Sequence, residues 1–331
     1  YELTYVKLKN LAVSERRPIR DIHRDIVRPL SLEVAGLLSW PHVRRTLQRI
    51  RRKTMPACQT LDEFIELFEK NDDVFECYGK LRDKAFYFGS ILNKSMVFVN
   101  QEIISKLKDN FDMYVDGTFS VTPFKSHQLL VILAEVEGRP RPVAYAIMSA
   151  RSEKEYTAVF SHLRDAAFSF DGIIRTPKNA TTDFEKAMRR AISKVWPQVT
   201  VFGCNFHLCQ AIHRKAVSME SLSTKVSGNS IHHKVLKMFM RLSLLPLNRI
   251  EAGHQALIQF INSSPELSKD FFEFIDYFER TWINRFPKEE WCTSSRARRS
   301  NNDLEGYNRF IKQFIPLHPG PWVFVDGLLD L

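Results

Sequence analysis

Residues 112–215 alternate between short apolar runs and amphipathic stretches, and this alternation limits the possible folds of the chain more than any other feature. Three apolar runs follow one another before the first helical pattern, and their length is typical of strands. After these runs, one helical pattern and one strand pattern follow each other in turn. We expect a strand within 112–120, strands over 128–136 and 142–148, a helix over 153–168, a strand over 180–183, a helix over 184–195, a strand over 199–203 and a helix over 206–216.

The order of these elements predicts how the strands are arranged. Three sequential strands joined by hairpins and followed by helix-strand crossovers predict an α/β domain with an RNase H-like mixed sheet. Because crossovers within one sheet are right-handed, the first strand should lie beside the fourth. Asp116 on the first strand and Asp183 at the end of the fourth would then face one another.

Helical patterns flank this core. Apolar residues recur at helical spacing over 1–55 and again over 218–288. In the second stretch Phe271, Phe274 and Phe278 share one helical face, which favours a buried role over base stacking. Between the first stretch and the core we expect a helix over 61–69, a hairpin of strands over 84–88 and 96–99, and a helix over 101–108.

These patterns predict five segments. They are a basic helical N-terminal module over 1–58, a helix-and-hairpin lead-in over 59–110, the first part of the core over 111–217, an all-helical insertion over 218–290 and the second part of the core over 291–331.

The composition narrows the class of protein. The chain has 331 residues, 44% of them hydrophobic, which is enough for a large core and more than one domain. Its apolar runs are shorter than the roughly 18 residues that a membrane span needs, so we expect no membrane partner. The five cysteines are an odd, scattered set, which favours a reducing compartment, the cytosol or the nucleus.

The positive charge is clustered. The chain carries 48 Lys and Arg against 38 Asp and Glu, a net charge of +10. Clustered cations can neutralise the phosphates of a nucleic acid, although solvated helix faces would explain the charge equally well. The candidate DNA-binding residues are Arg44, Arg45, Arg51, Arg52 and Lys53 in the N-terminal module, and Arg296, Arg298 and Arg299 in a basic loop.

Three carboxylates stand where ligands are usually presented. Asp116 lies on the first core strand, Asp183 lies at a strand-to-helix joint, and Glu305 begins the helix expected over 303–314. Each has a structural alternative, namely a turn Asp before Gly, a helix N-cap and a first-turn acid that favours the helix dipole. Carboxylates from two strands and a late helix could hold two Mg²⁺ or Mn²⁺ ions for phosphoryl transfer.

Four motifs decide between these alternatives. VDGTF, TTDFEKAM, FGCNFHLCQAIHRK and RRSNNDLEGYNRF together resemble the transposases of Mutator-like elements, the MULE transposase domain of the DDE superfamily, over residues from about 40 to 315. The resemblance implies an RNase H-like fold with a helical insertion before the last acid. It also implies a metal-binding and catalytic triad of Asp116, Asp183 and Glu305. Such a protein would use two Mg²⁺ or Mn²⁺ ions to cut DNA at transposon ends and join it to a target. It would act in the nucleus, as a dimer or larger assembly when two ends are held together.

The family also carries a Cys-x-x-His motif, which corresponds to Cys204 and His207. These residues could lie beside the metal pocket, or His207 could be an ordinary core histidine. A zinc site with Cys209 and His213 is a weaker alternative, because the spacing lacks the paired arms of a zinc finger. Asn308 stands where many relatives have His three residues after the Glu.

Two other functions fit the same residues. A domesticated, transposase-derived protein could bind DNA or chromatin without cutting it. A cellular RNase H-like nuclease would use the same chemistry on RNA, but the long insertion and the Asn-Asn-x-x-Glu context favour the transposase.

Overall fold

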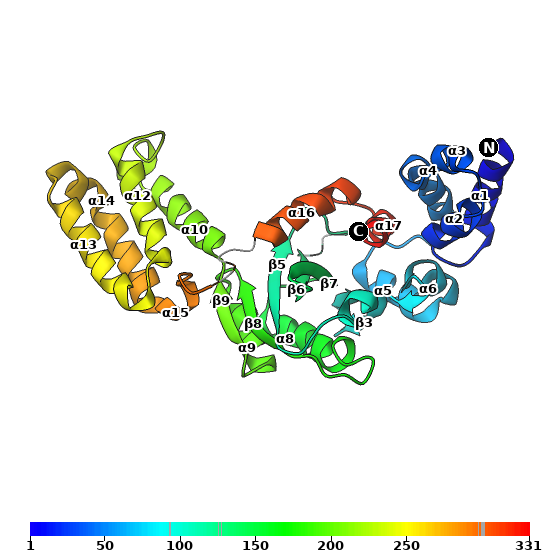
Figure 1. Ribbon diagram of the computed structural model, residues 1–331, viewed down its shortest axis with the longest axis horizontal. Coiled ribbons are helices and arrows are strands. Elements are labelled where there is room, and N and C mark those ends of the chain that lie inside the picture. Colours follow the sequence, from blue (N-terminus) through cyan, green and yellow to red (C-terminus); the bar gives the residue numbers. More distant parts are fainter. Residues whose placement is uncertain (93, 125, 127, 297, 299–301) are drawn as a thin grey trace. The chain divides into compact units, whose positions relative to one another are not determined.

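The computed structural model describes residues 1–331 except 93, 125, 127, 297 and 299–301 (Figure 1). The chain forms two compact units. Unit 1 comprises Tyr1–Phe111, Asp116–Thr176 and Gly306–Leu331, and unit 2 comprises Asp112–Val115 and Pro177–Glu305. Within the described ranges, every helix is too short or too polar to cross a membrane.

The strands form a mixed sheet of seven, as the sequence predicts for the class of fold. The strand order is β3-β4-β7-β6-β5-β8-β9, so the first core strand, β5, lies beside the fourth, β8, as expected. Neighbours β3–β4, β4–β7 and β6–β7 are antiparallel, whereas β8–β9 is parallel. The strands are β3 (Tyr87–Ile91), β4 (Ser95–Val99), β5 (Phe111–Thr118), β6 (Gln128–Val136), β7 (Arg139–Met148), β8 (Pro177–Thr182) and β9 (Thr200–Gly203).

The predicted hairpin before the core is present as β3 and β4, but with different strand bounds. Its first strand begins at Tyr87 rather than 84, because Lys84–Ala85 (β2) pairs with Lys80–Leu81 (β1) in a separate two-stranded sheet. Strand β4 then pairs with β7, so the hairpin extends the main sheet at its edge. All five residues of β4 are buried, which explains why an apolar run this short forms a strand.

The helices of unit 1 pack in two places. The N-terminal four bury their own apolar cluster, which includes Leu8, Ile22 and Leu47. Of the later helices, α5, α7 and α8 contact strands of the main sheet, whereas α17 contacts α4 and α6. Helix α8 passes into a π-helix at Leu163–Ala167, within the single helix expected over 153–168. The helices wholly within unit 1 are α1 (Glu2–Ser14), α2 (Ile19–Val27), α3 (Leu32–Leu37), α4 (Trp40–Arg52), α5 (Leu61–Lys70), α6 (Asp72–Tyr78), α7 (Gln101–Ile104), α8 (Glu153–His162) and α17 (Pro321–Asp330).

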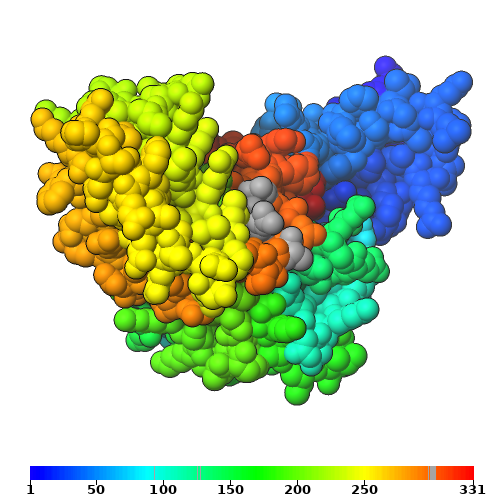
Figure 2. Space-filling model, turned by 60° about the vertical axis from the view of Figure 1, so that its left-hand side comes forward, coloured from blue at the N-terminus to red at the C-terminus, as the bar shows by residue number. Residues whose placement is uncertain are grey.

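Unit 2 joins the β8–β9 edge of the sheet to a helical body. Phe271, Phe274 and Phe278 are at most 1% exposed within it, so their predicted core role is confirmed. Figure 2 shows these helices, coloured yellow to orange, as one continuous packed surface. The helices wholly within unit 2 are α9 (Lys186–Val195), α10 (Asn205–Val217), α11 (Glu220–Ser223), α12 (Ile231–Arg241), α13 (Ile250–Asn262), α14 (Pro265–Phe278), a π-helix (Glu279–Arg285) and α15 (Lys288–Trp291), with short 3-10 turns at Leu242–Leu244 and Leu247–Arg249.

Candidate functional site

Asp116 lies near the end of β5 with its carboxylate held on both sides. Asp116 is 8% exposed. Oδ1 accepts a hydrogen bond from the Gly117 N–H at 2.9 Å, and Oδ2 accepts one from Asn308 Nδ2 at 3.1 Å. An added Cβ at Gly117 would lie 2.3 Å from Oε1 of Gln128, so that side chain would have to shift. Because β5 runs from Phe111 to Thr118, the Asp-Gly step is part of a strand and not a free turn.

Helix α16 (Asn302–Phe314) presents Asn308 to this carboxylate. Leu304 and Ile311 are fully buried on the helix, and the Tyr307 hydroxyl hydrogen-bonds the Tyr145 hydroxyl of β7. Burial raises the pKa of Tyr307 to about 12, so this hydroxyl stays protonated and can keep its hydrogen bond at neutral pH. The helix is thus anchored by buried apolar residues on either side of Asn308 and by a polar contact of the adjacent Tyr307.

The amide of Asn308 leaves one oxygen available beside the carboxylate. A carboxylate only accepts hydrogen bonds, so Nδ2 must face Asp116 and Oδ1 must point away from it. Oδ1 is buried and has no hydrogen-bond partner within the described part of the chain. Carboxylate and amide oxygens are ligands that hard divalent cations prefer, but the bond from Nδ2 to Asp116 turns Oδ1 away from the carboxylate. The metal-binding role of Asp116 stays a prediction, because within the described residues it is not part of a group of three His, Cys, Asp or Glu ligand atoms.

The two other predicted acids belong to unit 2. Asp183 follows β8 by one residue and is half-buried, and Glu305 is half-buried in the first turn of α16. Glu305 precedes Asn308 by three residues, so the two side chains share one helical face. Their roles as metal ligands remain predictions.

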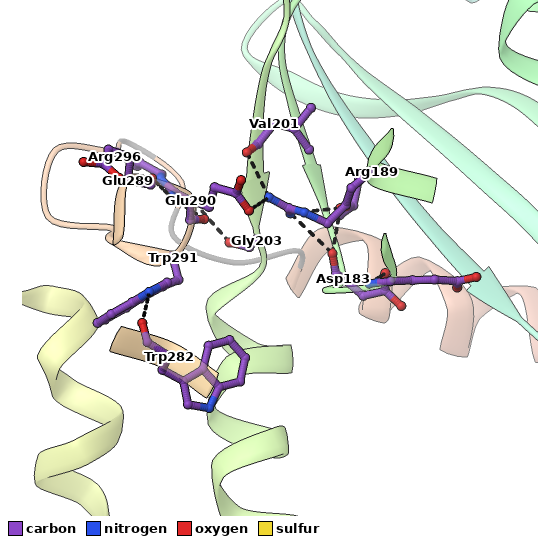
Figure 3. A network of polar contacts seen from close by, with 11 residues as sticks. Asp183, Arg189, Val201, Gly203, Trp282, Glu289, Glu290, Trp291 and Arg296 are labelled. Atoms are coloured by element: carbon purple, nitrogen blue, oxygen red, sulfur yellow. Dashed lines mark hydrogen bonds and ion pairs between the residues drawn. The ribbon is translucent and has the colours of Figure 1, made fainter. Parts of the chain in front are cut away.

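Asp183 is held by a local turn and not by a helix cap. Its Oδ1 accepts a hydrogen bond from the Glu185 N–H at 2.9 Å, and its carbonyl accepts one from Thr182 Oγ1 at 2.7 Å. Helix α9 begins only at Lys186, with Glu185 in the N-cap position. The N-cap alternative for Asp183 is therefore wrong. Figure 3 shows Asp183 with the polar network behind it, which includes Arg189.

The Cys-x-x-His pair begins α10. Cys204 is fully buried in the N-cap position, and its backbone N–H donates to the Thr182 carbonyl at 2.8 Å. His207 follows within the first turn, with its ring edge-on to Phe206. Burial raises the pKa of the Cys209 thiol, which opposes the thiolate that zinc requires. In the described residues, this segment supplies no cluster of three metal-ligand atoms.

A different cluster in unit 2 has metal-ligand chemistry. His232, Glu266 and Asp270 place one ligand atom each within 4.8 Å of one another. Asp270 already accepts hydrogen bonds from His232 Nε2 at 2.9 Å and from the Lys225 ammonium, and the Lys225 contact chiefly lowers the pKa of that carboxyl. The ammonium supplies the positive charge that a metal ion would otherwise bring. We therefore interpret the cluster as an ion pair between Lys225, which precedes α12, and Asp270 of α14, with His232 of α12 hydrogen-bonded to the same carboxylate.

The basic residues of α4 fall into two groups. Arg51 is fully buried and donates to the carbonyls of Ala12 and Arg17, so its predicted contact with DNA is corrected to a structural role. Two more cations are half-buried in ion pairs with α17, Arg44 with Asp330 and Arg52 with Asp326. The remaining candidates of this segment, Arg45 and Lys53, are exposed.

Two candidates of the basic loop, Arg296 and Arg298, also have contacts within the chain. Arg296 donates to the Gly203, Glu289 and Glu290 carbonyls, and burial lowers its pKa to about 10. Arg298 pairs with Asp303 at 2.7 Å. Arg299 lies outside the described residues.

The seven-stranded mixed sheet and its many helices define an α/β protein, in which Asp116 lies near the end of β5 and Asp183 directly follows β8. Residues 113–211 match the protein-family model of the MULE transposase domain, which confirms the resemblance found in the sequence and indicates a transposase-related function. No curated protein matches the chain. The matched segment contains Asp116, Asp183, Cys204 and His207, whereas Glu305 lies beyond it.

Sequence reasoning missed the contact between Asn308 and Asp116. The motif drew attention to Asn308 as a departure from relatives, but not to its bond with a residue 192 positions away. Arg189 was missed entirely, because a single Arg on an amphipathic helix carries no signal of its partners.

Proposed function

We propose that this chain is the catalytic region of a DDE-type DNA transposase, in which Asp116, Asp183 and Glu305 hold two Mg²⁺ or Mn²⁺ ions. The observation that carries the proposal is the family match, since it spans both aspartates in their motifs. The partner is then DNA, as transposon ends and as target. Holding two ends together calls for a dimer or larger assembly, and the reaction belongs in the nucleus.

When bound, the ions would activate a water or 3′-hydroxyl and stabilise the leaving oxygen. The chain's own part is to hold its ligands in place. The Gly117 N–H and the Asn308 amide orient the Asp116 carboxylate, and the Glu185 N–H orients that of Asp183. Hydrogen bonds that other residues make to metal ligands tune the affinity for the metal and orient the ligand side chains.

A domesticated protein that binds DNA or chromatin without cleavage is the second candidate. Asn308 favours it, because an amide replaces the His of many relatives next to the last acid. An amide cannot transfer a proton at neutral pH, so any step that needs an ionisable group there would be lost.

Cleavage of labelled supercoiled and linear DNA separates the two candidates. The wild-type protein is compared with Asp116→Ala, Asp183→Ala and Glu305→Ala, each with Mg²⁺, with Mn²⁺ and with a chelator. We expect metal-dependent nicking that each substitution abolishes, while folding by circular dichroism and DNA affinity are retained. Tight DNA binding without nicking by folded wild-type protein would favour the domesticated protein. Cleavage that survives the substitutions would refute the triad.

A further inference from the structure

The Arg189 side chain connects the loop of Asp183 to the helical insertion within unit 2 (Figure 3). Nη1 of Arg189 lies 3.4 Å from Thr182 Oγ1 and 3.5 Å from the Asp183 carbonyl oxygen. Nη2 donates to the Val201 carbonyl at 3.2 Å and to the Glu290 carboxylate. One guanidinium thus contacts the end of β8, the middle of β9 and helix α15.

The environment of Arg189 makes this connection stiff. Its side chain is 8% exposed, and burial lowers its pKa while Glu290 opposes that change. A guanidinium is a planar fork, so its two terminal nitrogens cannot move independently. Glu290 and the Thr182–Asp183 step therefore contact the same planar group.

Aromatic packing provides a second link at the adjacent residue. The Phe184 ring lies edge-on to Trp282 at 4.8 Å between centroids and to Phe286 at 5.3 Å. Trp282 lies in the π-helix of the insertion, and its carbonyl accepts the indole N–H of Trp291 in α15. Gly203 leaves the space for the Phe184 ring, since an added Cβ would lie 2.2 Å from it.

Helix α15 is itself tied to β9. Arg296 donates to the carbonyls of Glu289 and Glu290 and to that of Gly203, and its guanidinium lies 3.9 Å from the centroid of the Phe202 ring. The four residues of α15 are therefore held against the same strand that Arg189 contacts. The insertion is attached behind Asp183 and is not a loosely tethered domain.

We propose that Arg189 is a positioning residue that couples the helical insertion, through Glu290, to the loop that carries Asp183. Its relevance to catalysis rests on the proposed function, in which Asp183 is a metal ligand. A change in the insertion, such as DNA binding, would then reach the ligand through the Arg189–Glu290 ion pair.

Glu290→Gln tests the coupling, because it removes the charge while keeping the size of the side chain, and Glu290→Ala removes the hydrogen bond as well. Glu289→Gln is the matched control, since Glu289 is exposed on the same helix and contributes only its carbonyl to the network. The first measurement is hydrogen exchange of the Glu185 amide, which donates to Asp183 Oδ1. The second is the rate of metal-dependent nicking as a function of DNA concentration.

We expect amide exchange at Glu185 to accelerate about tenfold in Glu290→Gln and more in Glu290→Ala, with no change in Glu289→Gln. We also expect kcat for nicking to fall about tenfold while KM for DNA stays constant, as for loss of a residue that acts through a metal ligand. Unchanged exchange at Glu185 in both Glu290 variants would overturn the coupling.

The two proposals fail separately. Wild-type protein that does not nick DNA, but shows faster exchange at Glu185 in the Glu290 variants, would overturn the proposed function and leave the coupling standing. Wild-type protein that nicks DNA, with exchange and kcat unaltered in both variants, would overturn the coupling alone. A loss of folding in Glu290→Ala would leave the decision to Glu290→Gln.

Discussion

Asn308→Asp is the substitution that most directly tests the contact between α16 and the end of β5. In the native chain an amide nitrogen lies 3.1 Å from Oδ2 of Asp116. The substitution replaces this donor with a carboxylate of nearly the same shape. Two carboxylates at that separation repel one another, so one of them must retain a proton in the folded state.

The size of the effect follows from this distance. Two unit charges 3.1 Å apart repel by about 5 kcal/mol at an effective dielectric constant of 20. Protonating one ordinary Asp costs about 1.5 kcal/mol at pH 5 and about 4 kcal/mol at pH 7, so protonation is the cheaper response up to neutral pH. The folded variant then holds one more proton than the unfolded chain. Its stability therefore falls by about 1.4 kcal/mol for each pH unit between 5 and 7.

Urea unfolding from pH 5 to pH 8 in the presence of a chelator measures this slope. Asn308→Ala is the control that removes the hydrogen bond without adding a charge, and we expect it to cost about 1.5–3 kcal/mol with no new pH dependence. Gln313→Asp adds the same charge at an exposed position of the same helix and should leave the slope unchanged. If Asn308→Asp shows the same pH profile as the native protein, the two side chains are not in contact. Recovery of stability on addition of Mg²⁺ would in turn support metal binding at Asp116.

Two further predictions concern packing and charge. Gly203→Ala should lower the free energy of unfolding by about 1–3 kcal/mol, because the added Cβ would lie 2.2 Å from the Phe184 ring. The control is Gly36→Ala, which should not destabilise the chain because nothing lies within 4 Å of the added Cβ. Equal denaturation midpoints for both variants would contradict this prediction. Replacing exposed Arg45 and Lys53 together by Ala should reduce the dependence of DNA affinity on salt by about two in the slope of log K against log salt, which a titration by fluorescence anisotropy measures. An unaltered slope would make both residues part of a solvated helix face.

Local patterns were enough to predict the class of fold. The apolar runs over 128–136 and 142–148 lie within strands β6 and β7, because strand formation here depends on burial of successive residues that the sequence displays. The helical spacing of Phe271, Phe274 and Phe278 likewise predicted their burial. The place of β5 beside β8 followed because right-handed crossovers leave few alternatives, whereas the extension of the sheet by β3 and β4 was not predicted.

The partners of charged side chains could not be predicted in this way. Arg51 and Arg45 stand in the same basic run, yet one is fully buried against backbone carbonyls and the other is exposed. Arg296 donates to carbonyls of β9 and α15, partners that the sequence of its basic loop does not reveal, and its contact with DNA stays a prediction. A basic run in the sequence gives the number of cationic side chains, but it does not show which of them bind partners within the folded chain.

The sequence by itself determined the alternation of strands and helices, the motifs that match the MULE transposase domain, and the positions of Asp116 and Asp183 at strand ends. Only the tertiary structure decided that Asn308 holds Asp116 and that Arg189 joins Asp183 to Glu290. The physical reason is the range of the interactions. Hydrophobic periodicity depends on residues that are close in the sequence. A hydrogen bond between residues far apart in the chain forms only when the backbone between them has folded.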